Sequence, residues 1–181
     1  MYQPEEDSFF LSEELAKYLK SLSEKEKSKL KALDLGTGSG IQAENLIRLG
    51  IKKENILAAD INEKAIEKAK KLKIKIIKSD LFSKIEDKFD LIIFNPPYLP
   101  EIKFDKEKDI TGGKKGDETI LSFLKQVKSH LTKKGKIFLL LSSLTPAARI
   151  RTEIEKQKLI SRKIAEKKLF FELLEIWLIS F

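Results

Sequence analysis

The feature that most constrains this chain is an alternation of short apolar segments with longer amphipathic ones. The apolar segments have the length of buried strands and fall at 32–35, 56–59, 74–77, 89–94 and 136–141. Beside them, apolar residues recur at helical spacing over 8–22, 41–49, 62–72, 118–131 and 147–158. This alternation predicts an α/β fold, in which a mostly parallel sheet carries helices on both faces.

The end of the sequence departs from this alternation. Two extended segments, at about 161–167 and 170–179, follow the last helical segment and can form an antiparallel pair. We expect that pair to extend the sheet at one edge. A length of 181 residues suits a single domain, 1–181.

The beginning of the sequence is expected to add a helix outside the alternation. Apolar residues recur at helical spacing from about Ser8, and either Asp7 or Ser8 can act as the N-cap. We expect this segment, 1–30, to pack on the rest of the domain. Its last part, 23–29, is polar and is expected to be a connector.

Composition excludes several classes of protein and site. The chain has no Cys and one His, which argues against a disulfide framework, a thiol nucleophile and a metal site. No apolar run reaches the ~18–20 residues of a membrane span. The first residues are acidic and short of apolar side chains, which is not the pattern of a signal peptide. We therefore expect a cytoplasmic protein without a metal.

Charge is the compositional extreme. Charged residues make up 35% of the chain, and the net charge is +8. A basic balance favours an anionic partner such as nucleic acid. However, the lysines are spread over almost every segment, which favours a generally basic, solvated surface over a dedicated nucleic-acid face. Nucleic acid stays open as a partner, and a membrane does not.

Polar residues end four of the predicted parallel strands, where ligands bind in sheets of this kind. They are Asp34, Asp60, Asp80 and Asn95. The first is followed by the loop Gly36-Thr37-Gly38-Ser39-Gly40, in which Gly36 and Gly38 permit positive φ and close approach of a ligand to the backbone. The alternative reading of this loop is a tight turn from strand to helix.

The two acids that follow fit a nucleoside. Asp60 lies 20 residues beyond Gly40, where a carboxylate accepts hydrogen bonds from ribose hydroxyls. Asp80 and Leu81 can hold the amine and the flat face of an adenine. The alternatives are a surface acid beside a helix for Asp60 and an N-terminal cap for Asp80.

Asn95-Pro96-Pro97-Tyr98 is the most specific motif. Each proline fixes φ and cannot donate a backbone hydrogen bond, so nearby carbonyls stay available as acceptors. The Asn95 oxygen and the Pro96 carbonyl can each accept one N–H from a planar group that carries NH₂, while Tyr98 packs against its flat face. The alternative is a strand terminator made of two prolines.

Together these motifs resemble those of class I S-adenosylmethionine-dependent methyltransferases. Asn-Pro-Pro-Tyr is shared by enzymes that methylate amide or amine nitrogens, including adenine-N6 methyltransferases and the HemK/PrmC family, which acts on the glutamine of release factors. The opening segment 2–11 and the segment 111–118 are similar to the archaeal and eukaryotic branch of HemK/PrmC. The chain departs from that branch at Asp117, where Arg is usual.

The resemblance implies a Rossmann-like fold with a seven-stranded sheet and roles for individual residues. The implied contacts to S-adenosylmethionine come from Ser8, Asp34, Gly36, Gly38, Asp60, Asp80, Leu81 and Asn95. The substrate glutamine is expected to meet Asn95, Pro96, Pro97 and Tyr98, of which Asn95, Pro96 and Tyr98 are the implied catalytic residues.

The resemblance also implies two protein partners and leaves two other functions open. One partner is a release factor, as substrate, and the other is a small zinc-binding activator subunit at the sheet edge formed by Ile74–Ile77. The first alternative is adenine-N6 methylation of DNA or RNA, supported by the Asn-Pro-Pro-Tyr motif and the basic charge. The second is a binding module that has the fold but no catalytic activity.

Overall fold

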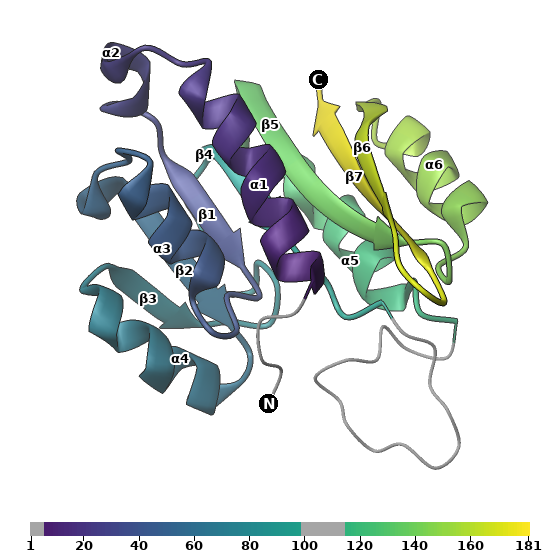
Figure 1. The fold of residues 1–181 in the computed structure, drawn as a ribbon, viewed down its shortest axis with the longest axis horizontal. Helices are drawn as coiled ribbons and strands as arrows, with labels where there is room; N and C mark the ends of the chain where they lie inside the picture. The colour runs from purple at the N-terminus through teal and green to yellow at the C-terminus, as the bar shows by residue number, and fades with distance from the viewer. Residues whose placement is uncertain (1–5, 99–114) are drawn as a thin grey trace.

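The computed structural model describes residues 6–98 and 115–181. Its centre is a seven-stranded sheet with the order β3-β2-β1-β4-β5-β7-β6 (Figure 1). The strands are β1 (Ala32–Leu35), β2 (Ile56–Asp60), β3 (Lys75–Lys78), β4 (Phe89–Phe94), β5 (Leu131–Ser142), β6 (Ile160–Lys168) and β7 (Leu173–Ser180). The first five pair in parallel, and β7 pairs antiparallel with both β5 and β6. The predicted fold class, including the C-terminal antiparallel pair, is confirmed.

The strand order contains a reversal that creates a place for a ligand. The chain moves outward from β1 through β2 to β3, and then returns to place β4 on the other side of β1. The connections that leave β1 and β4 therefore diverge from a common point. Ligands of open parallel sheets bind at the carboxyl ends of the strands beside such a switch point.

Helices cover both faces of the sheet, and each face has its own apolar core (Figure 1). One core takes side chains from α1 (Glu6–Lys20) and α3 (Ile41–Arg48), and the other from α5 (Glu118–Val127) and α6 (Ala147–Lys156). Because both faces are covered, all four residues of β1 are buried and apolar residues are not restricted to alternate positions.

Shorter helical elements complete the structure. The helix α4 (Glu63–Ala69) packs beside β2 and β3, and the Asn62 side chain caps its start. The described residues also form the 3₁₀ turns η1 (Lys53–Asn55), η2 (Lys70–Leu72) and η3 (Lys128–His130). No helix within the two described stretches is long and apolar enough to cross a membrane.

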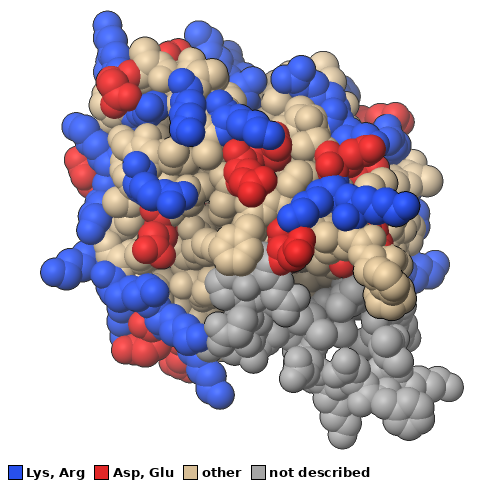
Figure 2. All heavy atoms as spheres, in the orientation of Figure 1, with Lys and Arg blue, Asp and Glu red and all other residues tan. Residues whose placement is uncertain are grey.

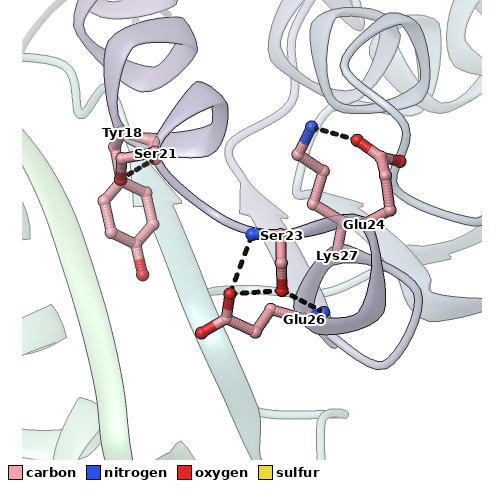
Figure 3. A network of polar contacts seen from close by, with 6 residues as sticks. All are labelled: Tyr18, Ser21, Ser23, Glu24, Glu26 and Lys27. Atoms are coloured by element: carbon pink, nitrogen blue, oxygen red, sulfur yellow. Dashed lines mark hydrogen bonds and ion pairs between the residues drawn. The ribbon is translucent and has the colours of Figure 1, made fainter.

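Two local predictions at the N-terminus were wrong. The helix α1 begins at Glu6, so Asp7 and Ser8 lie in its first turn and neither is its N-cap. The connector after α1 contains a further helical turn, α2 (Glu24–Lys27). Ser23 and Glu26 form a capping box around that turn, each side chain accepting from the other residue's backbone N–H (Figure 3). The Ser-x-x-Glu spacing is the signal for such a turn.

The strand β5 is longer than the apolar pattern indicated. It runs from Leu131 to Ser142, although its residues 132–134 are polar. Its pairing with β4 is irregular between Phe89 and Leu91. Gly135 lies at this irregularity, where an added Cβ would meet Leu131 Cγ at 2.8 Å and the Phe89 carbonyl oxygen at 2.9 Å. The strand therefore passes close to β4 at the one position that has no side chain.

Candidate active site

The carboxyl ends of β1, β2 and β4 lie side by side. Leu35, the last residue of β1, pairs with Ala59 of β2 on one side and with Phe94 of β4 on the other. The register therefore places Gly36 between Asp60 and Asn95. A Cβ added at Gly36 would lie 3.5 Å from the Phe94 ring and 4.0 Å from the Asn95 carbonyl oxygen. The glycine loop, the ribose-type acid and the Asn-Pro-Pro-Tyr motif thus converge, as predicted.

The glycine loop needs its glycines. The backbone φ angle is positive, at 66°, 52° and 86°, in Gly36, Gly38 and Gly40 respectively. Residues with a side chain rarely adopt such angles. The loop is fixed to β2 because the Thr37 N–H donates to the Ala59 carbonyl at 3.0 Å and the Gly38 N–H donates to Asp60 Oδ2 at 2.8 Å.

The Asp34 side chain stabilises this loop by hydrogen bonds. Its carboxyl group is buried, and Oδ2 accepts from the Thr37 hydroxyl at 2.6 Å and from the Ala43 N–H at 3.0 Å. Burial raises the pKa of Asp34 to about 7, and the charge of Asp60 adds to the rise, while the two hydrogen bonds oppose it. The structure thus gives Asp34 a role in holding the loop to α3. Its expected contact with the cofactor stays a prediction.

Asp60 ends β2 with both carboxylate oxygens directed to backbone groups. Oδ2 accepts from the Gly38 N–H and Oδ1 from the Asn62 N–H, each at 2.8 Å. These bonds fix the carboxylate of Asp60 beside the glycine loop, at the end of the strand next to β1, where an acid of this fold class accepts from ribose hydroxyls.

The loop after β3 brings Asp80 and Leu81 to the same edge. Ser79 joins it to β2, because the Ser79 N–H donates to the Asp60 carbonyl at 2.9 Å. Asp80 is exposed, and Leu81 is partly buried against the core with φ at 45°. A left-handed conformation is strained for a residue like leucine, and such strain is found most often at functional sites. This geometry suits an apolar wall beside an exposed carboxylate.

Asn95 has one half of its amide satisfied and the other half not. Nδ2 donates to Asp7 Oδ2 at 3.1 Å. Oδ1 is buried and has no hydrogen-bond partner among the residues that the structure describes. A buried acceptor without a partner costs about 1–3 kcal/mol of folding free energy. Such a group is expected where a ligand completes the hydrogen bonding.

The rest of the motif surrounds this amide. Pro96 is buried and Pro97 is half-buried. The Tyr98 ring packs against the core on the α1 face, and its hydroxyl donates to Asp7 Oδ2 over 3.4 Å. Asn95 and Tyr98 are thus both joined to one carboxylate.

Asp7 is the site residue that sequence reasoning missed. Its side chain is buried, and its partners Asn95 and Tyr98 lie 88 and 91 positions further along the chain. Ser8, which was expected at the site, is also buried, and its carbonyl accepts from Gln42 Nε2 at 2.8 Å. The only signal for Asp7 was its place in the opening segment 2–11. Residues 2–5 of that segment lie outside the described residues.

The segment 111–118 is only partly within the described residues, which resume at Lys115. Asp117 is fully buried at the start of α5, and Arg149 Nη1 of α6 donates to its Oδ1 at 2.8 Å. Burial raises the pKa of Asp117, and the Arg149 charge opposes that rise. A guanidinium is therefore present here, but it comes from α6 and not from position 117.

A hollow of about 250 Å³ lies elsewhere, at the end of β5. It is lined by Leu141, Ser142, Ser143, Thr145, Ala147, Ile150 and Glu175. None of the predicted site residues lines it. We therefore define the candidate site by the converging strand ends and not by this hollow.

Comparison with known proteins gives the family. The methyltransferase small domain family matches residues 12–171. A protein of Methanocaldococcus jannaschii, provisionally named a protein N5-glutamine methyltransferase, is 35% identical over 80% of this chain and 74% of its own length. A release factor glutamine methyltransferase of Lactococcus lactis is 34% identical over 71% of this chain and 52% of its own length. This chain thus spans about three quarters of the first relative and about half of the second.

Solved structures agree with the fold. The Mtq2–Trm112 complex of E. cuniculi, described as responsible for methylating the termination factor eRF1, contains a chain with a TM-score of 0.78 and 24% identity, covering 99% of this chain and 97% of that one. The 16S rRNA N2 G1207 methyltransferase of T. thermophilus, solved with AdoMet and guanosine, has a TM-score of 0.68 and 16% identity, covering 98% and 43%. With its converging glycine loop, acids and Asn-Pro-Pro-Tyr motif, the chain belongs to the methyltransferase small domain family.

Proposed function

We propose that this methyltransferase acts on the side-chain nitrogen of a glutamine, the one in the Gly-Gly-Gln motif of a translation release factor. One observation carries the proposal: Asn95 Oδ1 is buried and lacks a partner among the described residues, while Asp7 holds Asn95 Nδ2. An acceptor in that state suits a substrate group that brings its own N–H. The names of the relatives from M. jannaschii and L. lactis support the same acceptor.

The cofactor is S-adenosylmethionine, which supplies an electrophilic methyl group when it is bound. Gly36 and Gly38 would leave room for it beside the backbone, and Asp60 would accept from its ribose hydroxyls. Asp80 and Leu81 would receive the adenine, with Ser8 and Asp34 as further contacts. The positive φ angles of the glycines and the left-handed Leu81 support this assignment.

The acceptor nitrogen needs orientation, because an amide lone pair is delocalised over its carbonyl and is a poor nucleophile. Asn95 Oδ1 and the Pro96 carbonyl each accept one N–H of the glutamine, and Tyr98 packs against its flat face. These acceptors hold the nitrogen in line and stabilise the positive charge that develops as the N–C bond forms. The methyl group would come from the sulfonium of the bound cofactor, which would leave as a neutral thioether, and the nitrogen would release a proton to water.

The test is methyl transfer to a purified release factor, located by mass spectrometry. Asn95→Ala is expected to lower kcat by about 10²–10³-fold, because it removes an acceptor used in the transition state. Affinity for S-adenosylmethionine, measured by calorimetry, should change less than about threefold. Asn55→Ala is the matched control, since Asn55 is also part-buried but donates to the Ser28 carbonyl, far from the motif.

Two results would overturn this function. One is an Asn95→Ala variant that methylates the release factor at the wild-type rate. The other is a wild-type enzyme that leaves the Gly-Gly-Gln glutamine unmodified but labels adenine in tRNA, as expected for an adenine-N6 enzyme. A release factor with Gly-Gly-Glu in place of Gly-Gly-Gln gives the background in both assays.

We further propose that a small activator subunit adds to the β3 edge of the sheet. In the described sheet β3 has β2 as its only neighbour, and its two central residues, Ile76 and Ile77, are half-buried. The opposite edge strand, β6, carries a register irregularity and five charged residues among its nine, which disfavour further pairing. The E. cuniculi structure, a complex with Trm112, supports such a subunit. Zinc binding by that subunit stays a prediction.

Co-expression with the candidate subunit tests this second part. Ile76→Asp places a charge in the expected interface and is predicted to abolish co-purification. Ile160→Asp makes the same change on β6, where Ile160 is 68% exposed, and is predicted to leave it intact. Equal behaviour of the two variants would exclude the β3 edge.

A further inference from the structure

We propose that Asp7 is a positioning residue that decides which face of the Asn95 amide meets the acceptor group. The identity of that acceptor rests on the function proposed above, but the orientation of Asn95 does not. The proposal stands on the placement of one buried carboxylate against two members of the Asn-Pro-Pro-Tyr motif.

The Asp7 carboxylate is well placed to hold the motif. Its side chain is 4% exposed, in the first turn of α1. Oδ2 accepts from Asn95 Nδ2 at 3.1 Å and from the Tyr98 hydroxyl over 3.4 Å. The Asn95 contact has an ordinary hydrogen-bond length, and the Tyr98 contact is at the long limit for a hydroxyl donor. The contact between α1 and the end of β4 is therefore polar and directional.

An ionised carboxylate can only accept hydrogen bonds, whereas an amide has one accepting and one donating end. Turning the Asn95 amide over would set Oδ1 against Asp7 Oδ2, and two acceptors would then face each other. Asp7 therefore fixes Nδ2 toward α1 and Oδ1 away from it. This explains why Oδ1 is the half of the amide that lacks a partner among the described residues.

The helix that carries Asp7 is itself held firmly. Gln42 Nε2 donates to the Ser8 carbonyl at 2.8 Å, and Asn45 Nδ2 donates to the Ser12 carbonyl at 3.0 Å. Both donors lie on α3, the helix that follows the glycine loop. The orientation of the Asn95 amide therefore depends on the contacts between α1 and α3, the helix that follows the glycine loop.

The consequence concerns specificity. The Asn95 oxygen, directed away from Asp7, accepts from an N–H and rejects a group that offers only lone pairs. Asp7 thereby selects an NH₂-bearing acceptor without touching it. Asp7→Asn removes this selection, because an asparagine at position 7 can pair with either end of the Asn95 amide.

The first experiment needs no methyl acceptor. In ¹⁵N-labelled protein, the Asn95 side-chain NH₂, identified by its absence in Asn95→Asp, is expected to exchange slowly with water. Exchange is expected to be at least tenfold faster in Asp7→Asn. The control is Glu6→Gln, which changes the neighbouring carboxylate. Glu6 is exposed and forms an ion pair with Lys167 at 2.8 Å, so its substitution should leave the exchange rate of the Asn95 NH₂ unchanged.

The second experiment is a double-mutant cycle on methyl transfer. Asp7→Asn should lower kcat by about ten- to hundredfold, with little change in the affinity for S-adenosylmethionine. In the Asn95→Ala background, Asp7→Asn should lower kcat less than twofold further, because its effect passes through Asn95.

The outcomes separate the two proposals. Unchanged amide exchange in Asp7→Asn, or effects of Asp7 and Asn95 that multiply, would overturn the positioning role. Altered exchange in an enzyme that does not methylate a release factor would instead uphold the orientation of Asn95 and overturn the proposed substrate.

Discussion

At the scale of single residues, Asp34 makes stability depend on pH in the direction opposite to that of most carboxyl groups. Burial raises the pKa of Asp34 from 3.8 to about 7 in the folded protein. The folded state then keeps a proton that the unfolded chain loses. This stabilising contribution is therefore complete below about pH 4 and is lost as the pH rises through about 7.

Asp34→Asn is predicted to remove that dependence. An amide keeps the shape of the carboxyl group and an oxygen that can accept from Thr37, but it does not ionise. Urea unfolding between pH 5 and 8 should show wild-type stability falling relative to the variant, by at most about 4 kcal/mol over the full transition. Asp87→Asn removes an exposed carboxylate and serves as control. Parallel wild-type and Asp34→Asn curves would contradict the assignment.

Gly40 allows a second prediction at this scale. Gly40→Ala puts a Cβ at a φ of 86° and 3.1 Å from Leu72 Cδ1, so both backbone strain and crowding destabilise the loop. Gly50→Ala meets a similar φ of 96°, but its nearest neighbours are flexible side chains at 3.7 Å. Both variants should lose about 1–2 kcal/mol of stability from the backbone. Only Gly40→Ala should lose more and bind S-adenosylmethionine more weakly in calorimetry.

At the scale of elements, the pattern of apolar segments predicted the strands and helices well where burial decides them. The runs at 32–35 and 89–94 coincide with β1 and β4, because strands covered on both faces are apolar at most positions, here all but Asp34 and Asp90. The extension of β5 through the polar residues 132–134 could not be predicted from the pattern of apolar segments. Pairs with β4 flank those residues at Leu131 and Lys136, and the Thr132 hydroxyl donates to Asp90 Oδ1 at 2.8 Å.

In the candidate site, too, some residues could be placed from the sequence pattern and others could not. Gly36, Asp60 and Asn95 follow strand ends, and the fold alone brings them together. Asp7 could not be predicted, because its partners lie 88 and 91 positions away and α1 belongs to no strand–helix repeat. A buried acid that meets its partners only through packing of a separate helix leaves no local pattern in the sequence.

The packing of α1 on the sheet supports a prediction about this element. Leu15 is fully buried in the core on the α1 face. Leu15→Ala should cost about 2–5 kcal/mol of unfolding free energy, through lost burial and a residual cavity. It should also lower methyl transfer, because α1 carries Asp7. Glu13→Ala, on the exposed side of α1, should change neither. If Leu15→Ala were destabilised but fully active, α1 would not be needed to hold the site.

At the scale of the whole molecule, the net charge of +8 bears on the choice between protein and nucleic acid as substrate. Figure 2 shows Lys and Arg scattered over the described part of the visible face, with Asp and Glu among them. Ion pairs such as Lys163–Glu166 and Lys70–Glu67 join such neighbours. On this face the mixed charges favour a solvated basic surface over a single basic stripe.

Salt dependence distinguishes these two kinds of surface. A dedicated nucleic-acid face that neutralises about 6–10 phosphates loses about 10³–10⁵-fold in affinity between 50 and 200 mM salt. For this enzyme we expect weak tRNA binding that falls by less than about tenfold over that range, because few phosphates can be met at once. Methyl transfer to the release factor should stay within about threefold, since a hydrogen-bonded site is screened less than surface charge. Fluorescence anisotropy gives the tRNA affinity, and the methylation assay gives the rate of methyl transfer, each measured in the same series of buffers. A steep decline in tRNA affinity, together with labelling of the tRNA, would instead assign the basic surface to substrate binding.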